Sequence, residues 1–439
     1  MKYYSTNQTV KNVSLEEAVV KGLAEDKGLF MPENIKKLSD YFFDTIQTMS
    51  FQEIAHTVAD AFFGEDIDAD ALKNIVYETL EFDTPLVEVK KHIYSLELYH
   101  GPTLAFKDVG ARFMSRVLRY FIQKQGTHKL INVLVATSGD TGSAVANGFL
   151  GVEGIRVFVL YPKGKVSKIQ ESQFTTLGKN IIALEIDGTF DDCQRLVKTA
   201  FLDTELNHKL QLTSANSINV ARFLPQAFYY FYAFAQLRSM QPKLTAEELQ
   251  TVFCVPSGNF GNITAGLFAK KMGLPIKRFI AANNKNDIFL QYLNTGTYTP
   301  KPSVSTIANA MDVGDPSNFA RILDLYKNNY SEIKEEISGV SYTDQEISEG
   351  VKECLSEHNY LLDPHGSCGY IALNTLLDKD ENGIFLETAH PAKFAETVEN
   401  IIGREIEIPE KLQNFMRGEK KSIELSKDFE VFKDFLMKA

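Results

Sequence analysis

The spacing of hydrophobic residues changes near residue 96 of the chain. Before that point most stretches repeat their apolar positions as helices do, with polar breaks near Pro32 and Gly64. After it, short β-branched runs alternate with amphipathic stretches of helix length. This alternation predicts the α/β class, with mostly parallel sheets flanked by helices and a helical N-terminal segment.

Individual elements can be predicted from the same pattern. Five apolar runs are predicted to be buried strands: residues 130–135, 155–160, 180–186, 252–256 and 277–282. The stretches predicted to be helices are residues 143–149, 167–177, 191–202 and 263–272. Residues 294–318 are rich in Thr, Pro, Asn and Gly, which predicts a long loop. Residues 321–360 are charged and helical in pattern, and residues 428–436 predict an amphipathic surface helix.

The length of the chain predicts more than one domain. Its 439 residues, 44% hydrophobic and 23% charged, exceed what one simple core holds. We expect an N-terminal, mainly helical segment, residues 1–95, that packs on the large domain. A smaller α/β domain, residues 96–208, would carry a loop at Ser138 to Thr141, and a large α/β domain, residues 209–439, would carry a Gly/Asn-rich loop.

Charge and targeting signals narrow the class of protein. The net charge of −11 argues against a nucleic-acid partner, which would favour a basic patch. The four cysteines form no CxxC pair, which fits a reducing compartment. The first residues contain no apolar signal core, and the longest apolar-aromatic run, residues 227–237, is too short to span a bilayer. We therefore expect a cytoplasmic protein with no membrane segment.

Lys107 is the most informative residue of the chain. It follows a Gly-Pro turn at residues 101–102 and opens an apolar helical pattern. Burial lowers the pKa of a lysine amine and frees its lone pair, so this placement suits a Schiff-base nucleophile. The alternative is an ordinary surface lysine.

A Gly/Asn-rich loop, Pro256-Ser-Gly-Asn-Phe-Gly-Asn, lies between a predicted strand and a predicted helix. Its two glycines let the backbone approach a ligand closely, and the N–H groups at the helix start can bind a phosphate. It is neither a dinucleotide fingerprint nor a P-loop. The alternative is a plain strand-to-helix turn.

A second polar loop, residues 136–143, also follows a strand and opens a helix. Its hydroxyls and helix-start N–H groups suit a carboxylate, although Ser, Thr and Asp also cap helices without binding anything. Because ligands of α/β folds gather at the carboxyl ends of the strands, two such loops favour a binding site.

A third polar stretch, residues 214–226, contains Ser217 and Arg222 near a helix start. An arginine there could bind a substrate phosphate through two parallel N–H groups. The alternative is a helix cap with a surface arginine. His365 and His390 have no partner at metal-ligand spacing, so we predict no metal site and interpret both as structural or pocket-lining residues.

Taken together, these stretches resemble the threonine synthase family, in its longer microbial and fungal form. The matching segments occur in the family's order and span nearly the whole chain: residues 21–33, 100–114, 137–142, 161–166, 216–222, 257–262, 363–365 and 388–394. An ordered set of this size is far more specific than any single loop.

The resemblance implies a fold, a cofactor and a reaction. The fold is the tryptophan-synthase-β-like fold (fold type II) of pyridoxal 5'-phosphate enzymes. The reaction is that of a carbon–oxygen lyase acting on phosphate, at the last step of threonine biosynthesis. It converts O-phospho-L-homoserine and water to L-threonine and phosphate by γ-elimination and β-hydration.

The resemblance also implies roles for individual residues. Lys107 would form the Schiff base with the cofactor, and Thr388 would meet the pyridine nitrogen. Asp140 would lie in the loop that faces the ring hydroxyl and the substrate. The cofactor phosphate would be held by Gly258, Asn259, Phe260, Gly261 and Asn262. The substrate would be bound by Ser138 and Thr141, and its phosphate by Ser217 and Arg222.

The sequence departs at three places from the pattern that we expect of the family. Val109 stands where phenylalanine is expected, and Gly366-Ser367 stands where Thr-Ala is expected. Glu387 stands before Thr388, where a small or apolar residue is expected, and it bears on the electrostatics near the ring. None of the three removes a functional group assigned above.

Two other functions are compatible with parts of the pattern. Another enzyme of the same fold, such as a threonine or serine dehydratase or a phospho-lyase acting on a related phosphorylated amine, would keep the cofactor site. The segment at residues 216–222 favours a phosphorylated substrate. A non-catalytic relative would bind a ligand or a partner protein, but Lys107, both loops and Thr388 favour an enzyme. We expect a monomer or weak dimer.

Overall fold

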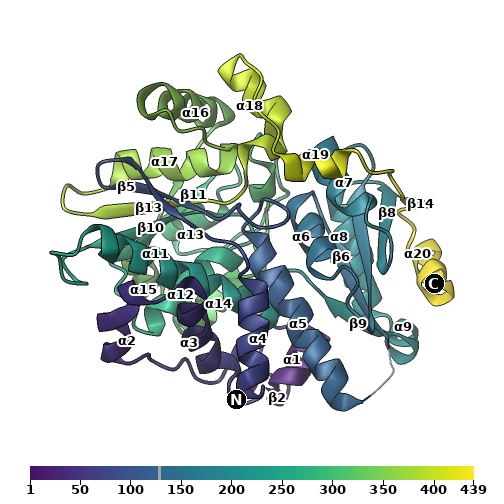
Figure 1. The fold of residues 1–439 in the computed structure, drawn as a ribbon. Helices are drawn as coiled ribbons and strands as arrows, with labels where there is room; N and C mark the ends of the chain where they lie inside the picture. Colours follow the sequence, from purple (N-terminus) through teal and green to yellow (C-terminus); the bar gives the residue numbers. More distant parts are fainter. Residues whose placement is uncertain (127–129) are drawn as a thin grey trace. The chain divides into compact units, whose positions relative to one another are not determined.

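The computed structural model describes residues 1–126 and 130–439, which form two compact units built from discontinuous segments (Figure 1). Unit 1 comprises Met1–Glu33, Lys107–Arg222 and Ile408–Ala439. Unit 2 comprises Asn34–Phe106 and Phe223–Glu407.

Unit 1 is built on a five-stranded parallel sheet in the order β14-β8-β7-β6-β9. Its strands are β6 (Ile131–Ala136), β7 (Ile155–Pro162), β8 (Ile181–Asp187), β9 (Gln211–Ser214) and β14 (Ile423–Ser426). Its longer helices are α5 (Lys107–Gln125), α6 (Asp140–Gly148), α7 (Lys168–Thr175), α8 (Phe190–Leu202) and α20 (Phe429–Lys438). Every residue of β6 is buried, because a central parallel strand has both faces covered.

Shorter elements complete unit 1. A three-stranded antiparallel sheet, in the order β2-β1-β3, lies near the N-terminus. The elements are β1 (Lys2–Ser5), β2 (Val13–Ser14), β3 (Phe30–Pro32), α1 (Leu15–Lys21), α9 (Thr204–Lys209), α10 (Val220–Phe223) and α19 (Glu410–Met416). Because α1 packs against β9, the N-terminal residues belong to this unit.

Unit 2 is built on a six-stranded sheet in the order β12-β11-β10-β13-β5-β4, parallel except for β4. Its strands are β4 (Leu86–Lys90), β5 (Ile93–Glu97), β10 (Thr251–Pro256), β11 (Arg278–Asn283), β12 (Ile337–Ser341) and β13 (Asn382–Glu387). The helix α17 (Pro364–Leu376) packs against β10, β11 and β13 and buries Cys368 and Leu373 in the core of the unit.

The remaining helices of unit 2 surround this sheet. They are α2 (Asp40–Thr45), α3 (Phe51–Phe63), α4 (Ala69–Thr79), α11 (Phe228–Met240), α12 (Gly261–Lys271), α13 (Ile288–Thr295), α14 (Phe319–Leu325), α15 (Tyr330–Glu336), α16 (Asp344–His358) and α18 (Ala395–Ile402). Four 3-10 turns are η1 (Ile46–Thr48), η2 (Leu224–Ala227), η3 (Asn309–Met311) and η4 (Pro391–Phe394). The aromatic helix α11 is buried along most of its length, which explains why its apolar residues occupy all sides.

The five predicted strands are confirmed as β6, β7, β8, β10 and β11, with ends shifted by one or two residues. The predicted helices correspond to α6, α7, α8, α12 and α20. Residues 321–360, predicted to be helical throughout, also contain the edge strand β12. Residues 1–95 contain strands as well as helices, among them β1, β3 and β4.

The division into units differs from the predicted boundaries at residues 95/96 and 208/209. The N-terminal residues 1–33 group with unit 1, whereas residues 34–95 group with unit 2. The C-terminal strand β14 pairs with β8, so the last residues complete the sheet of unit 1 (yellow beside teal in Figure 1). Strand pairing over long sequence distances therefore sets the division.

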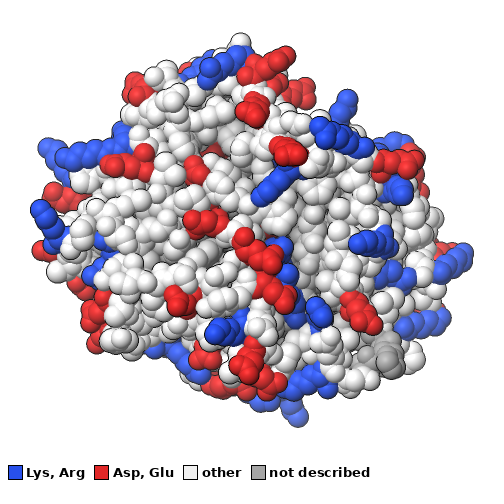
Figure 2. Space-filling view, in the orientation of Figure 1, with Lys and Arg blue, Asp and Glu red and all other residues white. Residues whose placement is uncertain are grey.

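The surface carries charges of both signs. Lys and Arg side chains are interspersed with Asp and Glu on the face shown in Figure 2. Oppositely charged side chains form ion pairs, for example Lys163 with Glu424 at 2.8 Å and Lys21 with Glu17 at 2.7 Å. Within the described ranges, no helix is both long and apolar enough to cross a membrane.

Candidate active site

The segment that precedes Lys107 is held by backbone hydrogen bonds to the segment that begins at Thr388. The Phe106 N–H donates to the Thr388 carbonyl at 2.9 Å, and the His390 N–H donates to the Leu104 carbonyl at 3.1 Å. Lys107 follows Phe106 directly, opens α5 and is half-buried. The backbone that leads into Lys107 is thus fixed against the residue predicted to meet the ring nitrogen.

Sequence reasoning missed the contribution of Lys393 to this arrangement. Its side chain is fully buried, and its Nζ donates to the Thr103 carbonyl at 2.8 Å. A buried ammonium is costly unless it is hydrogen-bonded, so this contact fixes the turn before Lys107 strongly. The only signal in the sequence was the place of Lys393 in the segment 388–394.

Arg222 lies against the helix that Lys107 opens. Its side chain is 3% exposed, and its Nε donates to the Ala215 carbonyl at 3.2 Å. A Cβ on Gly110 would overlap the Arg222 carbonyl and guanidinium, so the two residues are in direct contact. Gly110 follows Lys107 by three residues, which is about one helical turn. The interpretation of Arg222 as a surface arginine is therefore wrong. Half-buried Ser217 precedes it in the same segment.

The loop at Ser138 to Thr141 connects the end of β6 to the start of α6. Thr137 Oγ1 accepts hydrogen bonds from the Gly139 N–H at 2.9 Å and the Gly142 N–H at 2.8 Å. Gln170 Nε2 donates to Asp140 Oδ1 at 2.9 Å. Thr137 and Gln170 thus shape the loop and leave Ser138 and Thr141 half-buried. Nothing in the sequence near Asp140 indicates the role of Gln170, because Gln170 lies thirty residues after Asp140.

The Gly/Asn-rich loop connects β10 to α12 in unit 2. The loop residue Phe260 adopts a left-handed conformation with φ of 60°. Asn259 Oδ1 accepts from the Ser317 N–H at 2.6 Å, and its carbonyl accepts from Asn318 Nδ2 at 3.0 Å. A Cβ on Gly258 would lie 2.7 Å from the Ala310 carbonyl oxygen, so this position accepts no side chain without movement.

The start of α12 is suited to a phosphate group. The buried Asn262 Oδ1 accepts from the Tyr230 hydroxyl at 2.8 Å, whereas Asn262 Nδ2 has no hydrogen-bond partner among the described residues. The first N–H groups of a helix also lack intrahelical acceptors. An anionic oxygen at this place would satisfy both kinds of donor, so the residues present fit the phosphate of the predicted cofactor.

Thr388 is 7% exposed and follows Glu387, whose side chain is fully buried at the end of β13. Burial, and next the charge of Asp363, raise the pKa of the Glu387 carboxyl well above its ordinary value. This shift favours the neutral acid. The main effect of Glu387 is therefore to place a hydrogen-bonding group next to Thr388, and not a negative charge.

Both histidines named in the sequence have structural partners. His365 Nδ1 lies 2.6 Å from Asp363 Oδ2, and His365 Nε2 accepts from the Ala310 N–H at 3.1 Å. His390 Nδ1 accepts from the Ala392 N–H at 3.1 Å. Burial, together with the charge of His100, lowers the pKa of His390 to about 4. No group of three or more potential metal ligands occurs in residues 1–126 and 130–439.

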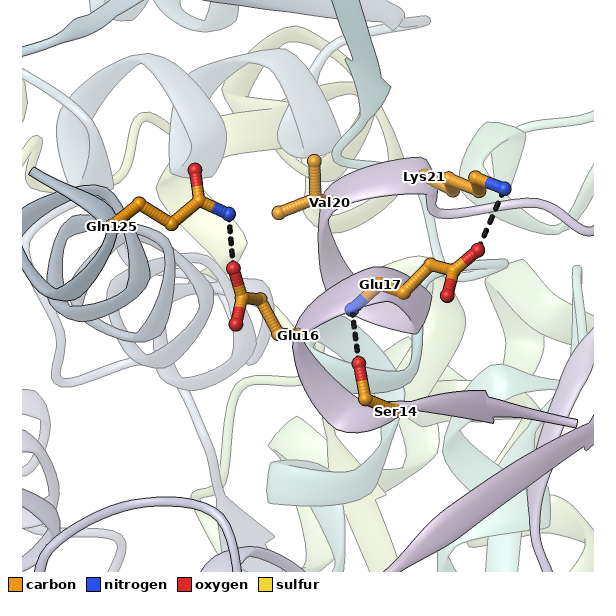
Figure 3. Close-up of a pocket in the computed structure, with 6 residues that line it drawn as sticks. All are labelled: Ser14, Glu16, Glu17, Val20, Lys21 and Gln125. Atoms are coloured by element: carbon orange, nitrogen blue, oxygen red, sulfur yellow. Dashed lines mark hydrogen bonds and ion pairs between the residues drawn. The ribbon is translucent and has the colours of Figure 1, made fainter. Parts of the chain in front are cut away.

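A surface pocket in unit 1 lies outside the predicted set of residues. It is lined by Ser14, Glu16, Glu17, Val20, Lys21 and Gln125 (Figure 3). Lys21 bonds Glu17 at 2.7 Å and Glu25 at 2.9 Å, and the Gln125 amide points to Glu16. The ammonium of Lys21 forms ion pairs with two carboxylates, so this lysine does not serve as a reactive amine.

Comparison with known proteins decides the family. Three family models match: "Pyridoxal-phosphate dependent enzyme" over residues 77–383, "Threonine synthase N terminus" over residues 2–80 and "Threonine synthase, C-terminal" over residues 367–436. The threonine synthase of Haemophilus influenzae is 44% identical over the full length of both chains. That of Saccharomyces cerevisiae is 38% identical, covering 91% of this chain and 89% of its own. The chain belongs to the threonine synthase family.

Solved structures agree with this membership of the threonine synthase family. Escherichia coli threonine synthase is 41% identical with a TM-score of 0.92, and the match covers 100% of both chains. A pyridoxal-phosphate-bound threonine synthase from Brucella melitensis is 34% identical with a TM-score of 0.92, covering 99% of this chain and 98% of that one. The predicted fold type II α/β class is confirmed, and the chain is an enzyme that uses pyridoxal phosphate.

Proposed function

We propose that this chain is a threonine synthase, a lyase that converts O-phospho-L-homoserine and water to L-threonine and phosphate. The observation that carries the proposal is the buried Arg222, in contact with Gly110 one turn along the helix from Lys107. Arginine binds phosphate through parallel N–H groups, and burial strengthens such a contact. A dehydratase acting on threonine or serine would have no phosphate to place there.

Separate residues have roles in holding each part of the cofactor. Pyridoxal phosphate, when bound, supplies the electron sink that stabilises negative charge beside the substrate nitrogen. Lys107 holds the cofactor through its amine, and Gly258, Asn259, Phe260, Gly261 and Asn262 hold its phosphate. Thr388 would offer the ring nitrogen a hydroxyl, which, unlike a carboxylate, does not stabilise a protonated ring. Gln170 orients Asp140, which lies in the loop that would face the ring hydroxyl and the substrate.

Other residues of unit 1 bind the substrate. Ser138 and Thr141, with the N–H groups at the start of α6, bind its carboxylate. Ser217 and Arg222 bind its phosphate and stabilise that group as it leaves the γ-carbon. The Lys107 amine would remove the α-proton and move protons at the β-carbon, where water then adds.

A phosphate-release assay on O-phospho-L-homoserine tests the proposal. We expect phosphate and threonine in equal amounts from the wild-type chain, and neither from Lys107→Ala. The same variant should lose the visible absorbance of the bound cofactor. Oxobutyrate as the product, or turnover of threonine or serine in place of phosphohomoserine, would identify a dehydratase instead.

We also propose that the enzyme acts in the cytoplasm as a monomer or weak dimer, without a nucleic-acid partner. The net charge of −11 and four free, buried cysteines support this environment. Sedimentation of the purified chain at micromolar concentration should give a mass near 49.3 kDa, with at most partial dimer. A stable tetramer would contradict the proposed assembly.

A further inference from the structure

Two of the departures from the family pattern meet in unit 2. Glu387 ends β13, and Gly366 lies in the first turn of α17. A Cβ on Gly366 would overlap the Oε2 atom of Glu387. The threonine expected at position 366 could therefore not coexist with this glutamate. The two departures are one exchange in space, in which a carboxyl group from β13 occupies the volume of a side chain missing from α17.

The Glu387 carboxyl joins these two elements. Its Oε1 accepts from the Asp363 N–H at 2.7 Å, while Oε2 has no hydrogen-bond partner in the part of the chain that the structure describes. Asp363 caps α17, since its Oδ1 accepts from the Gly366 N–H at 2.6 Å. The end of β13 is thus tied to the helix start by a fully buried side chain, where hydrogen bonds are strongest.

The same helix start reaches the cofactor phosphate loop. His365 Nε2 accepts from the Ala310 N–H, so its Nδ1 carries the proton and donates to Asp363 Oδ2 at 2.6 Å. Ala310 is the residue whose carbonyl would lie 2.7 Å from a Cβ on Gly258. Contacts therefore run without interruption from Glu387 to the turn that packs against the loop.

We propose that Glu387 and Gly366 are a matched pair that positions the cofactor site. The carboxyl fixes the end of β13, and with it Thr388. Through the start of α17 it also fixes the turn η3 that packs against Gly258. The inference rests on the cofactor roles proposed above for Thr388 and Gly258.

Four variants of the full-length enzyme test this pair: Gly366→Ala, Glu387→Ala, the double variant and Glu387→Gln. Cofactor is titrated into each apoenzyme to obtain its Kd, and the ³¹P resonance of the bound cofactor reports on the loop. We expect Gly366→Ala to raise Kd about tenfold, because its methyl group overlaps the carboxyl. Glu387→Ala should raise Kd about fivefold and shift the ³¹P resonance.

The double variant and the glutamine variant separate positioning from a merely structural role. The double variant should bind cofactor more tightly than Gly366→Ala, because the overlap is gone. Glu387→Gln keeps an oxygen acceptor for Asp363, so its Kd should stay within about threefold and its resonance should not move. If Gly366→Ala does not fold, the cofactor Kd and the ³¹P resonance of Glu387→Ala and Glu387→Gln still test whether the carboxyl positions the site.

Additive effects of the two alanine substitutions on log Kd would overturn the proposal. So would a Glu387→Ala enzyme with wild-type Kd and ³¹P resonance, even if its melting temperature falls. No substrate enters these measurements. A wild-type chain that fails to release phosphate from phosphohomoserine would refute the proposed function, and the coupling at Glu387 would still be measured.

Discussion

Gly258→Ala tests the cofactor phosphate loop most directly. A Cβ there would lie 2.7 Å from the Ala310 carbonyl oxygen and 3.0 Å from Met311 Cα, against an ordinary contact of about 3.5 Å. Both neighbours are backbone atoms, so neither can rotate away. Overpacking of this kind costs about 1–3 kcal/mol. If the loop moves to relieve it, cofactor affinity falls by a factor between about 5 and 150.

Gly403→Ala is the matched control for Gly258→Ala. Gly403 ends α18 at φ 72° with open space around it, so alanine there is strained by about 1–2 kcal/mol but meets no neighbour. Titration of both apoenzymes with pyridoxal phosphate should show a raised Kd for the variant at position 258 only. Both variants should melt at a lower temperature than the wild type. Wild-type cofactor affinity in Gly258→Ala would refute the role given to this loop.

Three further predictions concern the substrate and the stability of the fold. Arg222→Ala should raise the KM for phosphohomoserine about 10- to 100-fold and leave the cofactor Kd within twofold; an unchanged KM would move the phosphate site elsewhere. Gly110→Ala should raise the same KM by displacing the guanidinium, and a KM equal to wild type would contradict the contact. Although burial opposes it, hydrogen bonding to Arg278 holds the pKa of Glu381 at about 2. At pH values between this pKa and the ordinary pKa of a glutamate, the Glu381 carboxyl is protonated in the unfolded state but not in the folded state. The free energy of unfolding should therefore fall as the pH drops from about 5 to 2. After allowance for solvent screening, Glu381→Gln should unfold about 1–2 kcal/mol more easily at pH 7 and lose less stability on acidification; an unchanged slope would exclude this ion pair as the cause.

The interior strands β6, β7, β8, β10 and β11 could be predicted, because strands covered on both faces are continuous apolar runs. Edge strands could not. β12 contains Ser and Gly at partly exposed positions, and β14 is almost wholly exposed, so neither has the composition of a buried strand. β13 begins with Asn382-Gly383, a dipeptide typical of turns, although it lies in the middle of its sheet.

The residues with chemical roles could be proposed from motifs, but the residues that hold them could not. Gln170 lies 30 positions from Asp140, and Lys393 lies 290 positions from Thr103. Nothing in the local pattern pairs such positions, since the contacts arise only when the chain folds. For the same reason Glu387 and Gly366 stand out in the sequence only as two separate departures, and the volume that they share becomes visible only in the fold.

The pairing of β14 with β8 also bears on the order in which the chain can fold during synthesis. The last strand and α20 complete unit 1, where Phe432 and Leu436 are buried in the same core as Leu134 and Leu184. A ribosome releases these residues only after all of unit 2 has been synthesised. Unit 2 is complete in sequence by Glu407, whereas one sheet edge and part of the core of unit 1 stay open until β14 and α20 have been synthesised.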